Sequence, residues 1–202
     1  MSLSRRMLGA VALLSASLIV TGCSLTPPIA PHPALDRAER AATLTRRLTF
    51  EPGDETTASD ASPRTLIAVM RLAPQELRVV LTTPYGQRLT TLVRDASGSR
   101  FEQGDAPREE ALPFPPDWLA TRLEWSLWPR AALEEAFAGS DWRLDERDGH
   151  RLITYRGTRI ARITPPPSGR DASREVVLDD FQGDYRLRIT PLDATPDHET
   201  AP

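Results

Sequence analysis

The chain has 202 residues, with 25 Lys and Arg against 28 Asp and Glu, a formal net charge of -3 and a single Cys. One Cys excludes an internal disulfide framework, and the slight excess of acid excludes a basic surface of the kind that binds nucleic acid. The length suits one domain that is large enough to bury a real core.

The first 22 residues are predicted to be an export signal. Arg5 and Arg6 precede an apolar run over residues 7–20, which is shorter than the roughly 20 residues of a membrane-spanning helix. The run ends in Val-Thr-Gly-Cys at Cys23. This tetrapeptide resembles the lipobox of bacterial lipoproteins, in which the Cys sulfur takes a diacylglyceryl group and the signal is removed. The sequence therefore predicts a lipid anchor on Cys23, with a free thiol as the alternative.

Residues 23–40 are predicted to be a spacer between this anchor and a folded domain. The segment is rich in Pro, which favours an extended and semi-rigid chain.

Two or more acyl chains hold a protein stably on a membrane that it does not cross. Ser24 stands where an inner-membrane retention signal usually has Asp. By analogy with enterobacterial sorting, this implies an outer-membrane location that faces the periplasm.

Strand patterns dominate the rest of the chain. Short runs of alternating apolar and polar residues, separated by turns with Pro or Gly, predict antiparallel hairpins. The expected strands are residues 44–51, 65–72, 76–82, 87–95, 99–103, 142–146, 150–155, 158–164, 174–179 and 184–190. The polar segment 52–63 is predicted to be a loop, and residues 193–202 a disordered tail.

Two short helices are expected in the break between the fifth and sixth strands. Asp117 is predicted to cap the first helix, and Pro129 to occupy the first position of the second. The apolar side of such helices can cover an open sheet. We therefore expect a mainly β (α+β) domain over residues 41–192. Its curved antiparallel sheet forms an incomplete barrel, covered by two or three short helices inserted mid-chain.

Two motifs carry a resemblance to a known family. Residues 81–89 read LTTPYGQRL and residues 123–133 read LEWSLWPRAAL. In this order they resemble an uncharacterised lipoprotein family, the domain of unknown function 3261, over about residues 40–192. The Pro-x-Gly-Gln hairpin followed by a Trp-Pro helix start is also similar to the lipoprotein-localisation factor LolB. The LolB fold is an incomplete antiparallel barrel with helices lying in its mouth.

This resemblance implies a hydrophobic cavity between the sheet and the helices that holds acyl chains. Members of the uncharacterised family are often encoded beside aryl polyene or fatty-acid-like biosynthesis genes. The implied cargo is therefore a polyene lipid or the acyl chains of a lipoprotein. LolB delivers its cargo with an exposed apolar residue on a protruding loop, whereas the turn at residues 84–87 of this chain is expected to be too tight to protrude.

Apolar side chains on facing elements are the candidates for the cavity lining, with ordinary core packing as the alternative. The candidates from the sheet are Leu66, Ala68, Met70, Leu77, Val79 and Leu81. The candidates from the helices are Trp118, Leu123, Trp125, Trp128, Leu133 and Phe137. Both interpretations stay open, because large apolar groups at this spacing serve a core as well as a ligand.

The sequence offers little support for catalysis. It has no Gly-x-Ser-x-Gly elbow, zinc-ligand spacing, EF-hand loop or Gly-rich phosphate loop. His150 is the one His expected in the domain, beside a turn. The pairs Glu109-Glu110 and Glu134-Glu135 are expected on solvated faces. The pair Asp179-Asp180 is expected to end a strand and to form hydrogen bonds within the turn that follows. We therefore expect no enzyme, no metal and no cofactor.

The sequence leads to one main hypothesis and two alternatives. The main hypothesis is a non-enzymatic carrier or receptor for acyl chains, lipoproteins or polyene-type lipids, anchored to the outer membrane through Cys23. The first alternative is an accessory or scaffold lipoprotein that binds a protein partner of an envelope export or biosynthesis system. The second is a hydrolase, which would need a serine or carboxylate site assembled from distant positions.

Overall fold

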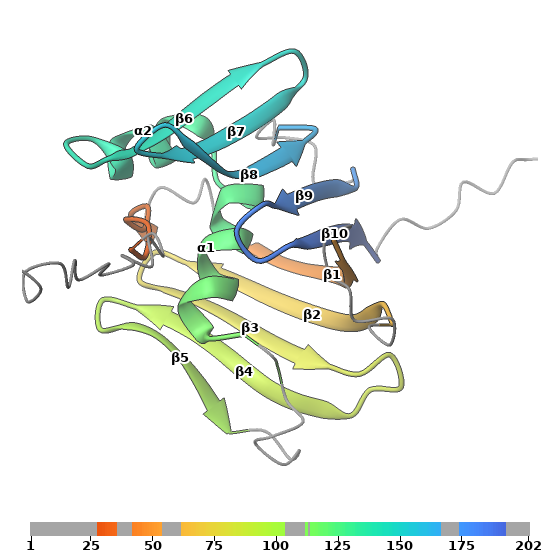
Figure 1. The fold of residues 1–202 in the computed structure, drawn as a ribbon. Coiled ribbons are helices and arrows are strands. Elements are labelled where there is room, and N and C mark those ends of the chain that lie inside the picture. Colours follow the sequence, from red (N-terminus) through yellow and green to blue (C-terminus); the bar gives the residue numbers. More distant parts are fainter. Residues whose placement is uncertain are drawn as a thin grey trace, which may run out of the picture.

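Ten antiparallel strands form one open sheet in the computed structural model (Figure 1). The residues that the structure describes are 28–35, 42–53, 62–103, 112, 114–166 and 174–192. The strands are β1 (Ala42–Pro52), β2 (Arg64–Ala73), β3 (Glu76–Thr82), β4 (Arg88–Asp95), β5 (Gly98–Gln103), β6 (Trp142–Arg147), β7 (His150–Tyr155), β8 (Thr158–Thr164), β9 (Val176–Asp180) and β10 (Tyr185–Pro191). The helices α1 (Pro116–Leu127) and α2 (Arg130–Phe137) lie between β5 and β6. This confirms the predicted mainly β fold with helices inserted mid-chain.

Several predicted features lie outside the described residues. They are the export signal at 1–22, Cys23, the rest of the spacer apart from 28–35, the pair Glu109-Glu110, most of the loop at 52–63 and the tail at 193–202.

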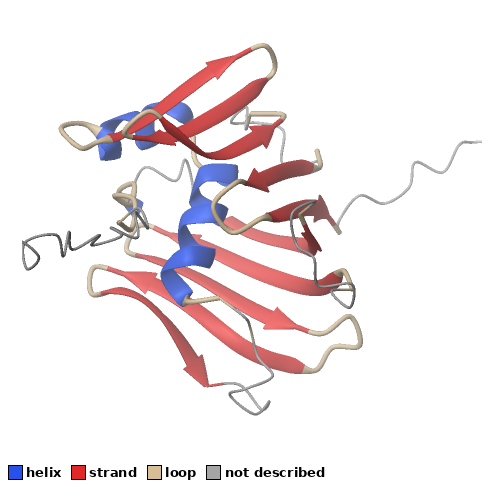
Figure 2. Cartoon of the chain, in the orientation of Figure 1, coloured by secondary structure: helices blue, strands red, loops and turns tan. Residues whose placement is uncertain are grey.

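The strand order explains why the helices lie across the sheet. The strands follow one another as β5-β4-β3-β2-β1-β10-β9-β8-β7-β6, so two series of hairpins meet where β1 pairs with β10. The chain leaves the sheet at one edge strand, β5, and returns at the other, β6. The connecting helices must therefore pass from edge to edge. α1 crosses the strands on one face, and α2 lies beside β6 (Figures 1 and 2).

The sheet buries its apolar side chains on the face that α1 covers. In β3, for example, Leu77, Val79 and Leu81 are fully buried, and the residues between them are only half-buried. This alternation is the period of two that a half-covered antiparallel sheet requires. Buried residues from both halves of the sheet and from both helices form one hydrophobic cluster.

α1 is buried on all its sides and not along one stripe. Every residue from Leu119 to Ser126 is buried, including Arg122 and Glu124. The reason is its position in the hollow of a curved sheet, where strands flank it on both sides. Of the described helices, neither has the length and apolar character needed to cross a membrane.

The helix starts differ slightly from the prediction. Pro115 occupies the N-cap position of α1 without a side-chain cap bond, and Asp117 lies in the first turn. Pro129 is the N-cap of α2 and not its first residue. Both helices therefore begin at a Pro whose ring fixes φ, and the charge of Asp117 lies near the positive end of the helix dipole.

Candidate functional site

The structure brings the predicted cavity-lining residues together beneath the helices. Trp118 is partly buried and packs against the hydrophobic cluster. The other predicted residues belong to that cluster and are at most 3% exposed: Leu66, Ala68, Met70, Leu77, Val79, Leu81, Leu123, Trp125, Trp128, Leu133 and Phe137. In this structure they pack as a core, and their contact with a ligand remains a prediction.

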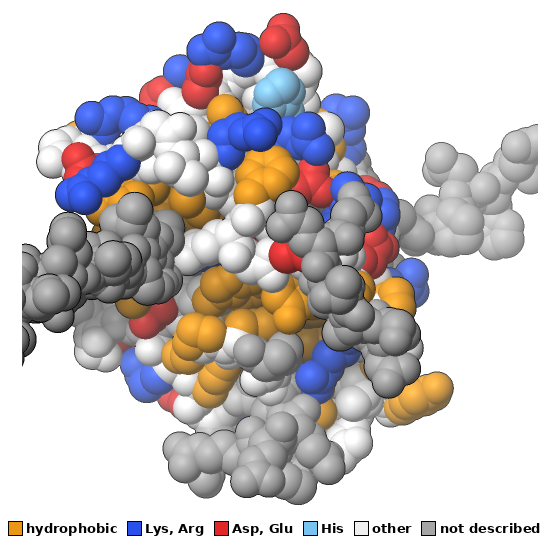
Figure 3. Space-filling model, in the orientation of Figure 1, with side chains coloured by type: hydrophobic (Ala, Val, Ile, Leu, Met, Phe, Trp, Pro, Cys, Tyr) orange, Lys and Arg blue, Asp and Glu red, His pale blue; other side chains and the backbone are white. Residues whose placement is uncertain are grey.

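Four aromatic rings lead from this core to the surface beside the first turn of α1. The ring centroids of Phe50 and Phe114 are 5.0 Å apart, and those of Phe114 and Trp118 are 4.7 Å apart. Tyr185, which is exposed, continues this aromatic row at 6.3 Å from Trp118. Figure 3 shows hydrophobic side chains gathered on this face of the molecule. These four rings, the aromatic row, therefore form a continuous line of contacts from the hydrophobic core to the surface.

A buried arginine fastens α1 next to the aromatic row. The guanidinium of Arg122 lies 4.8 Å from the ring centroid of Trp118 and 4.7 Å from that of Trp125. Its Nε donates to the carboxylate of Asp180 over 2.8 Å. Burial lowers the pKa of Arg122, and the charge of Asp180 opposes this shift. The ion pair joins α1 to the end of β9.

A second buried charge joins α1 to the other half of the sheet. The carboxylate of Glu124 is 2.6 Å from Nδ1 of His32 and 3.2 Å from Nε of Arg94. Nη2 of Arg94 also donates to the carbonyl of Pro33 over 3.1 Å. One carboxylate therefore connects α1, β4 and the segment before β1. The sequence interpretation missed this link because it placed His32 in a spacer.

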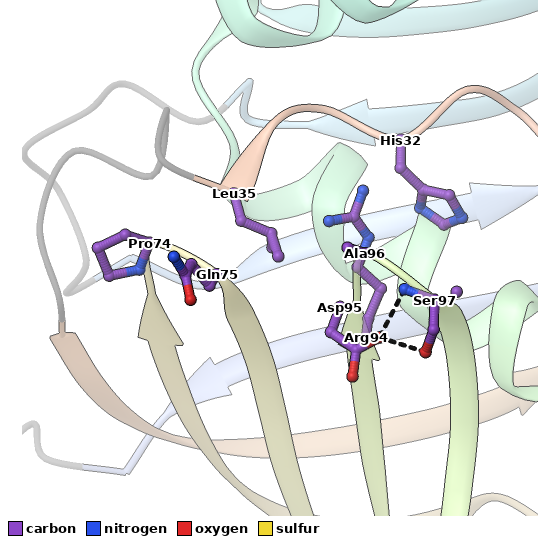
Figure 4. A pocket seen from close by; sticks show the side chains of 9 residues that line it. His32, Leu35, Pro74, Gln75, Arg94, Asp95, Ala96 and Ser97 are labelled. Carbon is purple, nitrogen blue, oxygen red and sulfur yellow. Dashed lines mark hydrogen bonds between the residues drawn. The ribbon is translucent and has the colours of Figure 1, made fainter.

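Residues 28–35 pack on the domain, although they belong to the predicted spacer. Ala30 and Leu35 are buried in the hydrophobic cluster, and Pro33 is buried as well. Together with the polar contacts of His32 and Pro33, this packing holds the segment across one end of the sheet (Figure 4).

A pocket of about 920 Å³ lies between this segment and the neighbouring turns of the sheet (Figure 4). Its lining residues are His32, Leu35, Pro74, Gln75, Arg94, Asp95, Ala96, Ser97 and Gly98. Asp95 accepts hydrogen bonds from the hydroxyl and the backbone N–H of Ser97 and from Arg100, which lowers the pKa of Asp95 to about 2. The charged groups of the pocket are thus already engaged with other protein groups.

The end of α1 depends on a third buried charge. Arg151 is completely buried, and its Nη1 donates to the carbonyls of Trp125 and Trp128 over 2.7 and 3.0 Å. Pro129 has no N–H with which to bind the carbonyl of Trp125 four residues earlier, so Arg151 replaces that missing donor. Nε of Arg151 binds Glu146 over 2.6 Å.

A comparison with known protein families gives one match. The family described as "Protein of unknown function (DUF3261)" has a model that matches residues 43–193. The chain belongs to this family. The match runs from β1 to the end of β10, so the DUF3261 domain includes the whole sheet and both helices. No curated protein matches the chain.

Within the described part of the DUF3261 domain, no three His, Cys, Asp or Glu residues are grouped so that they could hold a metal ion. Glu134 is exposed and pairs with Arg130 over 2.7 Å, as expected of a solvated face. Asp180 accepts from the backbone N–H groups of Gln182 and Gly183, as turn chemistry predicts, and it also holds Arg122.

Proposed function

We propose that this chain is a membrane-anchored lipoprotein whose DUF3261 domain is a non-enzymatic carrier or receptor for acyl chains. Its cargo is a polyene-type lipid or the acyl chains of a lipoprotein at the outer membrane. The observation that carries the proposal is the aromatic row, which connects a large hydrophobic interior with the surface. The motif similarity to LolB supports the same conclusion.

The first turn of α1 is the part of the helix that can yield to an acyl chain. Further along, Arg122, Glu124 and the carbonyl of Trp125 hold the helix through buried polar bonds. The first turn contacts its surroundings through the buried side chain of Leu119 and through Trp118, whose ring stacks on Phe114 and lies against the guanidinium of Arg122. Each buried CH2 group contributes about 0.8 kcal/mol, so a few methylenes offset the roughly 0.5–1.5 kcal/mol of an aromatic pair.

Replacing Trp118 with alanine is expected to weaken the binding of a long-chain fatty acid about tenfold, because the acyl chain loses its largest contact at the entrance. The measurement is a titration of residues 24–202 with a fluorescent fatty acid. Native mass spectrometry of the same protein should show a retained lipid.

The control for this variant is Phe181→Ala, which removes an aromatic ring on the outer side of the sheet. Phe181 is exposed, and its ring lies under Arg159 and Arg162, away from α1. Its loss should leave binding unchanged. Equal binding by the Trp118→Ala variant and the unaltered protein, or no binding by either, would refute the carrier proposal.

One observation favours the scaffold function as a second candidate. Tyr85, at the turn between β3 and β4, is 98% exposed. Tyr is enriched in protein interfaces because one end of its ring system is apolar and the other polar. A photo-reactive amino acid at Tyr85 is expected to cross-link one envelope protein in cells if the chain is a scaffold. The same group at Phe181 should not, and cross-links from neither position would count against a partner at this turn.

A further inference from the structure

The segment before β1 fixes the point at which the chain leaves the domain. Residues 28–35 run past the β2–β3 turn at Pro74 and Gln75 and the β4–β5 turn at Ala96 (Figure 4). The buried side chain of Leu35 and the bond between His32 and Glu124 hold the segment in place. The domain is therefore not suspended on the full length of the predicted spacer.

The distance from this point to the proposed anchor is short. Five residue steps separate Cys23 from Pro28. A fully extended chain covers at most about 3.6 Å per residue, so these steps span no more than about 18 Å. If acyl chains on Cys23 lie in a bilayer, this end of the sheet lies beside the lipid headgroups.

The exposed residues at this end of the sheet are suited to such a neighbour. The exposed residues that the structure describes in the segment and at the tips of the two turns are uncharged: Pro28, Ile29, Ala34, Pro74, Gln75, Ala96 and Ser97. Beside the β4–β5 turn, Asp95 and Arg100 form an ion pair over 2.7 Å, so their charges cancel. Ile29 is 61% exposed. An acidic protein on an anionic membrane meets the least repulsion through a surface without net negative charge, and an exposed Ile gains from contact with the interface.

The opposite end of the sheet, where Tyr85 lies, is far from the β2–β3 turn. β3 has 7 residues, and at about 3.3 Å per residue it separates the β2–β3 turn from Tyr85 by more than 20 Å. That is longer than the chain between Cys23 and Pro28 can span. When the first end lies on the bilayer, Tyr85 points away from it.

From these observations we infer that the end of the sheet formed by residues 28–35 and the β2–β3 and β4–β5 turns is a docking surface for the lipid bilayer. The pocket of about 920 Å³ then opens toward the headgroups, and Tyr85 faces the aqueous side. The inference rests on the proposed lipid anchor at Cys23.

Fluorescent labels at the two ends of the sheet test this orientation. The full chain, residues 1–22 included, is expressed in bacteria with either Ala96→Cys or Tyr85→Cys, two exposed positions, and is purified from the cells. Cys23 is the only native Cys, so each variant takes one label. The proteins are placed in phosphatidylcholine vesicles that contain a headgroup-linked quencher. We expect a strong loss of fluorescence at position 96 and none at position 85. Gln75→Cys, also exposed, repeats the test at the neighbouring turn.

The outcomes separate the orientation from the anchor. If the proteins float with the vesicles but position 85 is quenched as much as position 96, or neither is quenched, the docking surface is wrong and the anchor stands. If the proteins fail to float, as is expected of Cys23→Ala, the anchor proposal itself is wrong and the docking surface falls with it.

Discussion

Replacing Arg151 with methionine is expected to lower the free energy of unfolding by about 3–5 kcal/mol. Methionine fills much of the same space but donates no hydrogen bonds. The carbonyls of Trp125 and Trp128 lose a donor in a buried place, and each unsatisfied buried acceptor costs about 1–3 kcal/mol. The measurement is urea denaturation of the anchor-free protein, followed by far-ultraviolet circular dichroism.

The matched control is Arg147→Met at the end of β6. The side chain of Arg147 is 70% exposed, and it pairs with Asp145, whose side chain is 42% exposed. Such pairs contribute about 0–1 kcal/mol, so this variant should unfold at nearly the same urea concentration as the unaltered protein. A loss below about 1 kcal/mol for Arg151→Met would show that water or a shift of α1 satisfies the two carbonyls.

The hairpins of the sheet could be predicted because their signals are local. β7, for example, has the predicted bounds of residues 150–155. Its strand alternates, and the preceding turn places Asp148 and Gly149 at positive φ, as a tight hairpin turn requires. The pairing of β1 with β10 was not predicted. Its register sets Leu48 opposite Ile189, and no local pattern connects residues so far apart in the chain.

The buried charges on α1 were missed for a different reason. Charged residues are rarely fully buried, and an amphipathic helix normally turns them toward solvent. Here the helix must cross from one sheet edge to the other, so Arg122 and Glu124 have no solvent to face. The sequence did contain a signal for the burial of these two residues, since both lie among apolar neighbours within 119–127. Their partners Asp180 and Arg94, however, could be identified only from the fold.

Asp180→Ala is the second substitution with a large expected effect, again a loss of about 3–5 kcal/mol in the free energy of unfolding. It leaves the guanidinium of Arg122 buried between two Trp rings without its carboxylate. It also removes the acceptor for the N–H groups of Gln182 and Gly183. Urea denaturation measures the loss.

The control for this variant is Asp179→Ala. Asp179 pairs with the half-exposed Arg162 and Arg186 on the other face of β9. Loss of these pairs should lower the free energy of unfolding by about 1 kcal/mol.

A double substitution distinguishes loss of the ion pair from damage to the turn. If the cost of Asp180→Ala comes mainly from an uncompensated buried charge, then adding Arg122→Met should restore part of the stability, since replacing both partners of a buried pair by apolar groups is often close to neutral. If the cost comes from the backbone N–H groups of the β9–β10 turn, the second substitution will add to the first. Recovery would show that the ion pair between Arg122 and Asp180, and not the hydrogen bonds of the turn, accounts for most of the stability that Asp180 contributes.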